Sequence, residues 1–307
     1  MQLLRPLALP RGGTVGVCSP AGPVEEPCLA WGIEWLRGAG FDVICSPNVL
    51  ERCGYLAGSD QARLTDFLSL IRDPSIHAIV YSRGGYGTAR WLEQLDPREL
   101  RDARKLVIGH SDATSLGLYL RARAGLASIH GPMLQRQDLT LEAQHRVLAM
   151  ACGEPAALEP LVGRSLRGGD ACGPLVGGNL TLVTSSLGTP WEIDTRGAIL
   201  FLEDIAEQPY AIDRQLSQLR AAGKLSGLLG VALGEFVRCE STRYPDRSAH
   251  DVLHELLGAA FEGPIVRDLP FGHIADNRAL PVGLPARLDG DAGTLTLLEA
   301  AVESSIR

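Results

Sequence analysis

The chain has 307 residues, a length that predicts two compact domains, and 45% of its residues are hydrophobic against 21% charged. This composition excludes disordered, collagenous and coiled-coil proteins. The net charge of −7 argues against nucleic acid as a partner, because binding a phosphate backbone requires a basic face.

The sequence predicts neither a membrane segment nor a disulfide framework. It has no run of roughly 18 consecutive apolar residues, and Pro6 and Pro10 interrupt the apolar run at its start, so we expect no signal peptide, anchor or membrane partner. The seven cysteines are widely spaced and form no C-x-x-C pair. This favours a reducing, cytoplasmic compartment and indicates no zinc site.

Short apolar runs alternate with amphipathic stretches in the first half of the chain. This alternation is typical of a parallel sheet covered by helices on both faces, and it predicts a doubly wound α/β domain over residues 1–152. The predicted strands occupy residues 14–20, 42–47, 77–82, 105–111 and 127–132. The predicted helices occupy residues 25–36, 59–73 with Ser59 as the N-cap, and 141–152.

The periodicity disappears over residues 153–174, where glycine and proline become frequent, and this segment is predicted to be a linker. The remaining residues, 175–307, predict a smaller mixed α+β domain. Its expected elements are strands near 198–204, 227–236 and 294–300 and a helix over 213–223.

The third predicted strand runs into a glycine-rich loop, SRGGYGTARWL. Ligands of open parallel sheets bind beyond the carboxyl ends of the strands, and Gly84, Gly85 and Gly87 would let backbone N–H groups point into such a cleft. The loop could cradle a phosphate, donate to the oxyanion of an acyl-transfer intermediate, or form a plain tight turn. It lacks the G-K-[ST] ending of a phosphate-binding loop, which favours the oxyanion.

The fourth predicted strand turns sharply into a helix at the sequence GHSDAT, which resembles a nucleophile elbow. Gly109 and Ala113 supply the small neighbours that an exposed Ser111 requires there. The N–H groups of Asp112 and Gly85 would then be the oxyanion donors. The alternative is that Ser111 or Asp112 only caps the helix.

A serine nucleophile requires a base and an orienting carboxylate. His273 is the candidate base because it lies in a turn-rich loop, whereas His110 is too close to Ser111 in sequence. Glu203, at the end of an apolar strand, requires a buried partner such as an imidazole N–H or an arginine. Asp204 is its rival.

The sequence HDVLH places His250 and His254 one helical turn apart, close to a zinc motif. Aspartate is a carbon shorter than the usual glutamate, and no third ligand has an obvious spacing. A solvated helix face is the favoured interpretation.

The order of Ser111, Glu203 and His273, together with seven short motifs, resembles the LD-carboxypeptidase family of bacterial serine peptidases, which includes muramoyltetrapeptide carboxypeptidases and microcin self-immunity peptidases. The motifs are SPAGPV, SRGGYGTAR, GHSDAT, HGPM, GGNLTL, LFLEDIAEQPYAIDRQLSQL and PFGH. Their order covers nearly the whole chain. One departure is His110, where family members commonly have an aromatic residue.

The resemblance implies a Ser111, His273 and Glu203 triad divided between an N-terminal domain similar to class I glutamine amidotransferases and a C-terminal domain. It also implies a homodimer, with neither a cofactor nor a metal ion. The expected reaction is hydrolysis of a peptide bond from an L-centre to a D-amino acid, most simply release of D-alanine from a murein tetrapeptide during cell-wall recycling. Arg83 is a candidate clamp for the terminal carboxylate, with a purely structural role as the alternative.

Three other functions remain open from the sequence. A relative in the same family could hydrolyse a microcin-type peptidyl-nucleotide amide. A doubly wound domain with a second lobe also describes non-catalytic small-molecule binding proteins, although these are normally exported. A lipase or esterase would share the elbow but usually has a strict G-x-S-x-G sequence.

Overall fold

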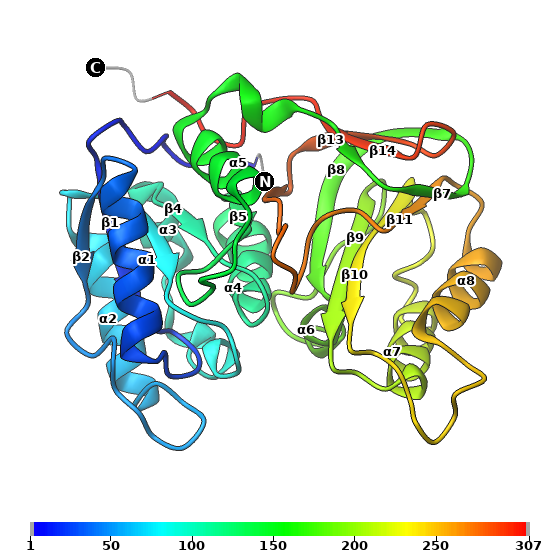
Figure 1. The fold of residues 1–307 in the computed structure, drawn as a ribbon, viewed down its shortest axis with the longest axis horizontal. Coiled ribbons are helices and arrows are strands. Elements are labelled where there is room, and N and C mark those ends of the chain that lie inside the picture. Colours follow the sequence, from blue (N-terminus) through cyan, green and yellow to red (C-terminus); the bar gives the residue numbers. More distant parts are fainter. Residues whose placement is uncertain (1–2, 305–307) are drawn as a thin grey trace.

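Two sheets lie side by side in the computed structural model, which describes residues 3–304 (Figure 1). The first sheet has the strand order β12-β5-β4-β3-β1-β2, and all its neighbouring strands are parallel except β12 and β5. Its strands are β1 (Thr14–Cys18), β2 (Asp42–Cys45), β3 (Ile76–Tyr81), β4 (Leu106–Ile108), β5 (Ser128–His130) and β12 (Leu280–Val282).

Helices cover both faces of the first sheet. Successive residues of β3 enter different apolar cores: Ile79 packs in the core with α2, α3 and α4, and Val80 packs in the core with α1 and α5. The helices are α1 (Glu26–Gly38), α2 (Asp60–Arg72), α3 (Pro97–Ala103), α4 (Ala113–Tyr119) and α5 (Leu141–Cys152). The predicted strands and helices of this half are confirmed, as is the Ser59 cap, whose hydroxyl accepts the Ala62 N–H at 3.1 Å.

The second sheet is mixed and has the order β6-β14-β13-β8-β9-β10-β11-β7. Its centre, from β8 to β11, is parallel, and its remaining pairs are antiparallel. Its strands are β6 (Leu161–Val162), β7 (Arg164–Arg167), β8 (Asp170–Asn179), β9 (Ile199–Ile205), β10 (Gly230–Val237), β11 (Ile265–Arg267), β13 (Pro285–Asp289) and β14 (Thr294–Leu297). The associated helices are α6 (Leu180–Ser185), α7 (Pro209–Ala221) and α8 (Ala249–Ala260).

The segment over residues 153–174, predicted to be a linker, differs in the structure. It contains β6, β7 and the first half of β8, which all belong to the second sheet. Gly173 and Pro174 lie within β8, opposite Ala286 and Pro285 of β13, and the other glycines and prolines of the segment lie between its strands or before them. The strands were hidden because these residues break the alternating pattern by which strands are recognised.

The chain returns to the first sheet after it has built most of the second. Residues 270–284 cross between the two sheets, and β12 adds an antiparallel edge strand beside β5 (Figure 1). The sequence predicted only a turn-rich loop here. The lobes also meet at Asn179, whose N–H donates to Thr114 Oγ1 of α4 at 3.1 Å.

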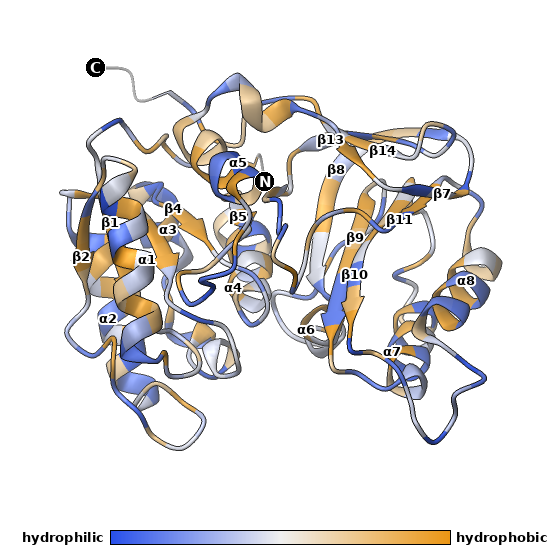
Figure 2. Cartoon of the chain, viewed as in Figure 1, coloured by the Kyte–Doolittle hydropathy of each residue, from blue (hydrophilic) through white to orange (hydrophobic). Residues whose placement is uncertain are grey.

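An aromatic cluster fills the space between the lobes. His130 of β5 contacts Phe201 of β9 and Phe271 edge-on, with ring centroids 5.3 and 6.5 Å apart. Figure 2 shows that most strands of both sheets are hydrophobic, whereas the helices combine hydrophobic and hydrophilic residues. No helix within residues 3–304 is both long and apolar enough to cross a membrane.

Burial of His130 makes stability dependent on pH. Burial, and secondarily the charge of His273, lowers the pKa of His130 from 6.5 to about 3. Between these values the unfolded chain binds a proton that the folded chain does not, so stability is lost as pH falls below 6.5.

We expect His130→Leu to reduce this acid destabilisation. At pH 5 the buried imidazole costs about 2 kcal/mol, because each pKa unit is worth about 1.4 kcal/mol. Urea unfolding at pH 7.5 and pH 5 should therefore show that the variant loses about 2 kcal/mol less stability than the wild type between the two. Equal losses in both proteins would contradict the assignment.

Candidate active site

Ser111 occupies a strained turn between β4 and α4. Its φ angle is +59°, in the left-handed region that residues other than glycine seldom adopt. A Cβ added at Gly109 would lie 2.8 Å from the Cβ of Ala113, so the turn requires a small residue at this position. This is the geometry of a nucleophile elbow, as the sequence predicted.

The glycine-rich loop after β3 lies directly against Ser111. A Cβ added at Gly84 would lie 3.1 Å from Ser111 Oγ, so only glycine lets the loop approach so closely. Gly85 has a φ angle of +107°. Within residues 3–304, the N–H groups of Gly85 and Asp112 have no acceptor, which leaves both available to a ligand.

The Asp112 side chain ties this loop to the elbow, a role that the sequence analysis did not assign. Its Oδ2 accepts the Thr88 N–H at 2.9 Å, and the residue is fully buried. Burial raises the pKa of this carboxyl above its usual range. Asp112 therefore fixes the distance between two backbone segments, in addition to offering its own N–H.

His273 and Glu203 are hydrogen-bonded to each other. His273 Nδ1 lies 2.7 Å from Glu203 Oε2, and the Glu203 side chain is 0% exposed against 13% for His273. A carboxylate oxygen accepts, so Nδ1 carries the proton and Nε2 presents a lone pair. Glu203 thus has the imidazole partner that its burial required, and no arginine pairs with it among the described residues.

Asp204 has a different task. Its Oδ1 accepts from Asn179 Nδ2 at 2.8 Å, and its Oδ2 accepts the N–H of Thr181 at 2.9 Å, so it holds the start of α6. Burial and the charge of Glu203 raise its pKa to about 6. These contacts exclude it as the partner of His273.

His110 forms a wall beside His273. The two rings are edge-on with centroids 4.9 Å apart, and His110 Nδ1 donates to the Gly131 carbonyl at 3.0 Å. Burial, and secondarily the charge of His273, lowers the pKa of His110 to about 3, so its ring is neutral. His273 therefore packs against the residue that precedes Ser111, and within residues 3–304 the Ser111 hydroxyl makes no hydrogen bond to His273 or to any other residue.

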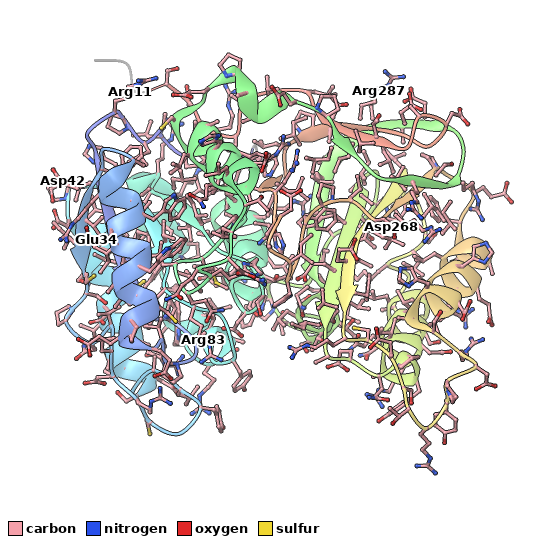
Figure 3. All side chains as sticks on the ribbon, in the orientation of Figure 1. Arg11, Glu34, Asp42, Arg83, Asp268 and Arg287 are labelled. Atoms are coloured by element: carbon pink, nitrogen blue, oxygen red, sulfur yellow. The ribbon has the colours of Figure 1, made fainter. Side chains whose placement is uncertain are left out.

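The remaining predicted residues lie outside this cluster. Arg83, in the first lobe, donates from Nη1 to the Pro23 carbonyl at 2.8 Å and is half-buried (Figure 3). His250 and His254 are exposed on α8, and His250 Nε2 lies 3.7 Å from Asp268. The described residues contain no group of three or more side chains able to hold a metal ion, and all seven cysteines are free.

Serine hydrolases typically have a serine on such an elbow, together with an imidazole that a buried carboxylate orients. The comparisons identify the family. The N-terminal domain model of the LD-carboxypeptidase family matches residues 15–131, and the C-terminal domain model matches residues 172–288.

Individual relatives align over nearly the whole chain. A Synechocystis protein that carries a carboxypeptidase name is 44% identical, and the alignment covers 97% of this chain and 98% of the relative. A murein tetrapeptide carboxypeptidase of Pseudomonas aeruginosa is 33% identical, and the alignment covers 92% of this chain and 95% of the relative. The crystal structure of a muramoyltetrapeptide carboxypeptidase from Oxalobacter formigenes superposes with a TM-score of 0.82 at 32% identity. The superposition covers 92% of this chain and 97% of that chain. The chain therefore belongs to the LD-carboxypeptidase family and is a carboxypeptidase of the serine type.

Gly272 controls the contact between His273 and Glu203. Its φ angle is +112°, and a Cβ added there would lie 2.9 Å from Glu203 Oε2. We expect Gly272→Ala to push the imidazole away from the carboxylate and to lower kcat about 100-fold, the usual effect of a misplacement of about 1 Å.

Steady-state peptide hydrolysis measures this effect, with circular dichroism to establish that the variant folds. Gly223→Ala is the matched control, because Gly223 also has a positive φ angle, +73°, but faces open space. A folded Gly272→Ala variant with wild-type kcat would contradict the prediction.

Proposed function

We propose that this carboxypeptidase releases the terminal D-alanine of murein tetrapeptides, with Ser111 as the nucleophile, His273 as the general base and Glu203 as the residue that orients it. The observation that carries this proposal is the 2.7 Å contact between His273 Nδ1 and a fully buried Glu203. It fixes one tautomer of an imidazole whose ring packs against His110, the residue before Ser111.

The reaction begins when His273 Nε2 takes the proton of the Ser111 hydroxyl. The serine oxygen attacks the carbonyl carbon of the peptide bond to D-alanine. The oxyanion that forms accepts hydrogen bonds from the unpaired N–H groups of Gly85 and Asp112. His273 then gives its proton to the departing amine of D-alanine. Water, activated by the same imidazole, hydrolyses the acyl-enzyme and restores Ser111.

The substrate proposal rests on the relatives, since the proteins from Pseudomonas aeruginosa and Oxalobacter formigenes are named for murein and muramoyl tetrapeptides. Arg83 is our candidate for recognition of the terminal carboxylate. Only its Nη1 has a partner within residues 3–304, so its other N–H groups are free to bind an anion.

Finer features of this proposal stay predictions. The family resemblance implies a homodimer and the likeness of the first lobe to class I glutamine amidotransferases, the loss of periodicity implies a domain boundary near residue 152, and the cysteine pattern favours a cytoplasmic location. Hydrolysis of a peptidyl-nucleotide amide is the alternative activity.

The nucleophile is tested by Ser111→Ala, which should abolish release of D-alanine from UDP-muramoyl-tetrapeptide. Mass spectrometry of the products measures the release and also detects cleavage of a peptidyl-nucleotide amide offered in parallel. Ser185→Ala, on the exposed end of α6, is the control and should retain full activity. Equal rates for Ser111→Ala and the wild type would refute the proposed mechanism.

The role of Arg83 is tested by Arg83→Gln. Loss of a charged contact to the substrate carboxylate should raise KM about 10-fold or more, because hydrogen bonds to charged groups are worth about 1.5–3 kcal/mol. kcat should change little. A tetrapeptide whose C-terminal carboxylate is replaced by an amide should be hydrolysed equally by both proteins; an equal KM for the natural substrate would assign Arg83 a structural role.

A further inference from the structure

The segment that carries His273 is held by both lobes. On the second lobe, the Phe271 carbonyl accepts the Glu235 N–H at 3.1 Å, and His273 itself meets Glu203. From residue 273 onward the contacts change to the first lobe, and they continue into the pairing of β12 with β5. His273 therefore lies at the point where the chain passes from one lobe to the other.

Three hydrogen bonds attach this segment to the loop that precedes α5 in the first lobe. Arg136 Nη1 donates to the His273 carbonyl at 2.9 Å. The Thr140 N–H donates to the Ala275 carbonyl at 3.1 Å, and the Thr140 hydroxyl donates to Asp276 Oδ1 at 2.9 Å. The first of these bonds reaches the main chain of the proposed base itself.

Arg136 is itself held in place. Asp138 accepts from Arg136 Nε at 2.9 Å and from Nη2 at 2.7 Å, so one edge of the guanidinium is occupied by a carboxylate. The remaining Nη1 is directed at the His273 carbonyl, and the Arg136 side chain is 23% exposed. A rigid fork with a charge-assisted bond fixes a carbonyl more firmly than a flexible lysine would.

We propose that Arg136, oriented by Asp138, is a positioning residue that couples His273 to the lobe carrying Ser111. The inference rests on the proposed function, because it assigns a purpose to the position of the base. It has a mechanical consequence: the bond from the first lobe helps to hold His273 against Glu203, so its loss loosens both that contact and the position of His273 relative to the first lobe.

A fluorophosphonate, which phosphonylates activated serines with loss of fluoride, tests the coupling without any peptide substrate. We expect the full chain with Arg136→Ala to be labelled at Ser111 about 10-fold to 100-fold more slowly than the wild type, since small misplacements have effects of this size. Arg136→Lys should retain part of the rate, and added guanidinium should restore part of it in Arg136→Ala. Arg11→Ala, which removes an exposed arginine paired with Glu154, is the matched control and should label normally.

A second measurement separates positioning from contact with the reagent. The proton between His273 Nδ1 and Glu203 should give a downfield NMR signal in the wild type and in Arg11→Ala, and the signal should broaden or disappear in Arg136→Ala. Wild-type labelling by Arg136→Ala, or slow labelling with an unchanged proton signal, would overturn the inference. If the wild type itself were not labelled, the proposed serine mechanism would fail, and the proton signal alone would then decide the role of Arg136.

Discussion

The hydrogen bond between His273 and Glu203 is the interaction on which the arrangement of the site depends. A carboxylate with no exposed surface is costly unless it is paired, and His273 is the partner that the fold provides. Strand β9 makes this possible because successive residues face opposite ways. Glu203 points with Phe201 into the space between the lobes, whereas Asp204 points toward α6.

The requirement for close approach explains the unusual backbone around the site. Ser111 adopts a positive φ angle at the end of a buried strand, and Gly84 packs against its side chain. Such strain persists only when surrounding contacts determine it, and here the buried Asp112 carboxylate binds the adjacent loop through the Thr88 N–H. The elbow and the glycine loop are therefore one unit.

Local patterns made much of this structure predictable. The alternating runs of the first half, the Ser59 cap and the small residues around Ser111 are all signals within a few positions of one another. Contacts between distant residues left no such signal: β12 is recognisable only beside β5, and Arg136 lies 137 positions from His273. For the same reason, glycines and prolines made β6 to β8 look like a linker. The sequence left an arginine open as the partner of Glu203, and its pairing with His273 was predicted from the expected burial of the carboxylate together with the family resemblance.

The histidine in front of Ser111 shows how burial can change the chemistry of a residue. A charged imidazole with its ring centre 4.9 Å from that of His273 would oppose formation of the imidazolium that the proposed mechanism requires. Burial lowers the pKa of His110 to about 3, so its ring stays neutral at any pH near 7. Its Nδ1–H is satisfied by the Gly131 carbonyl, and its edge packs on His273. His110 therefore packs against His273 as a neutral ring, and in the proposed mechanism the proton taken from Ser111 has a single imidazole to occupy.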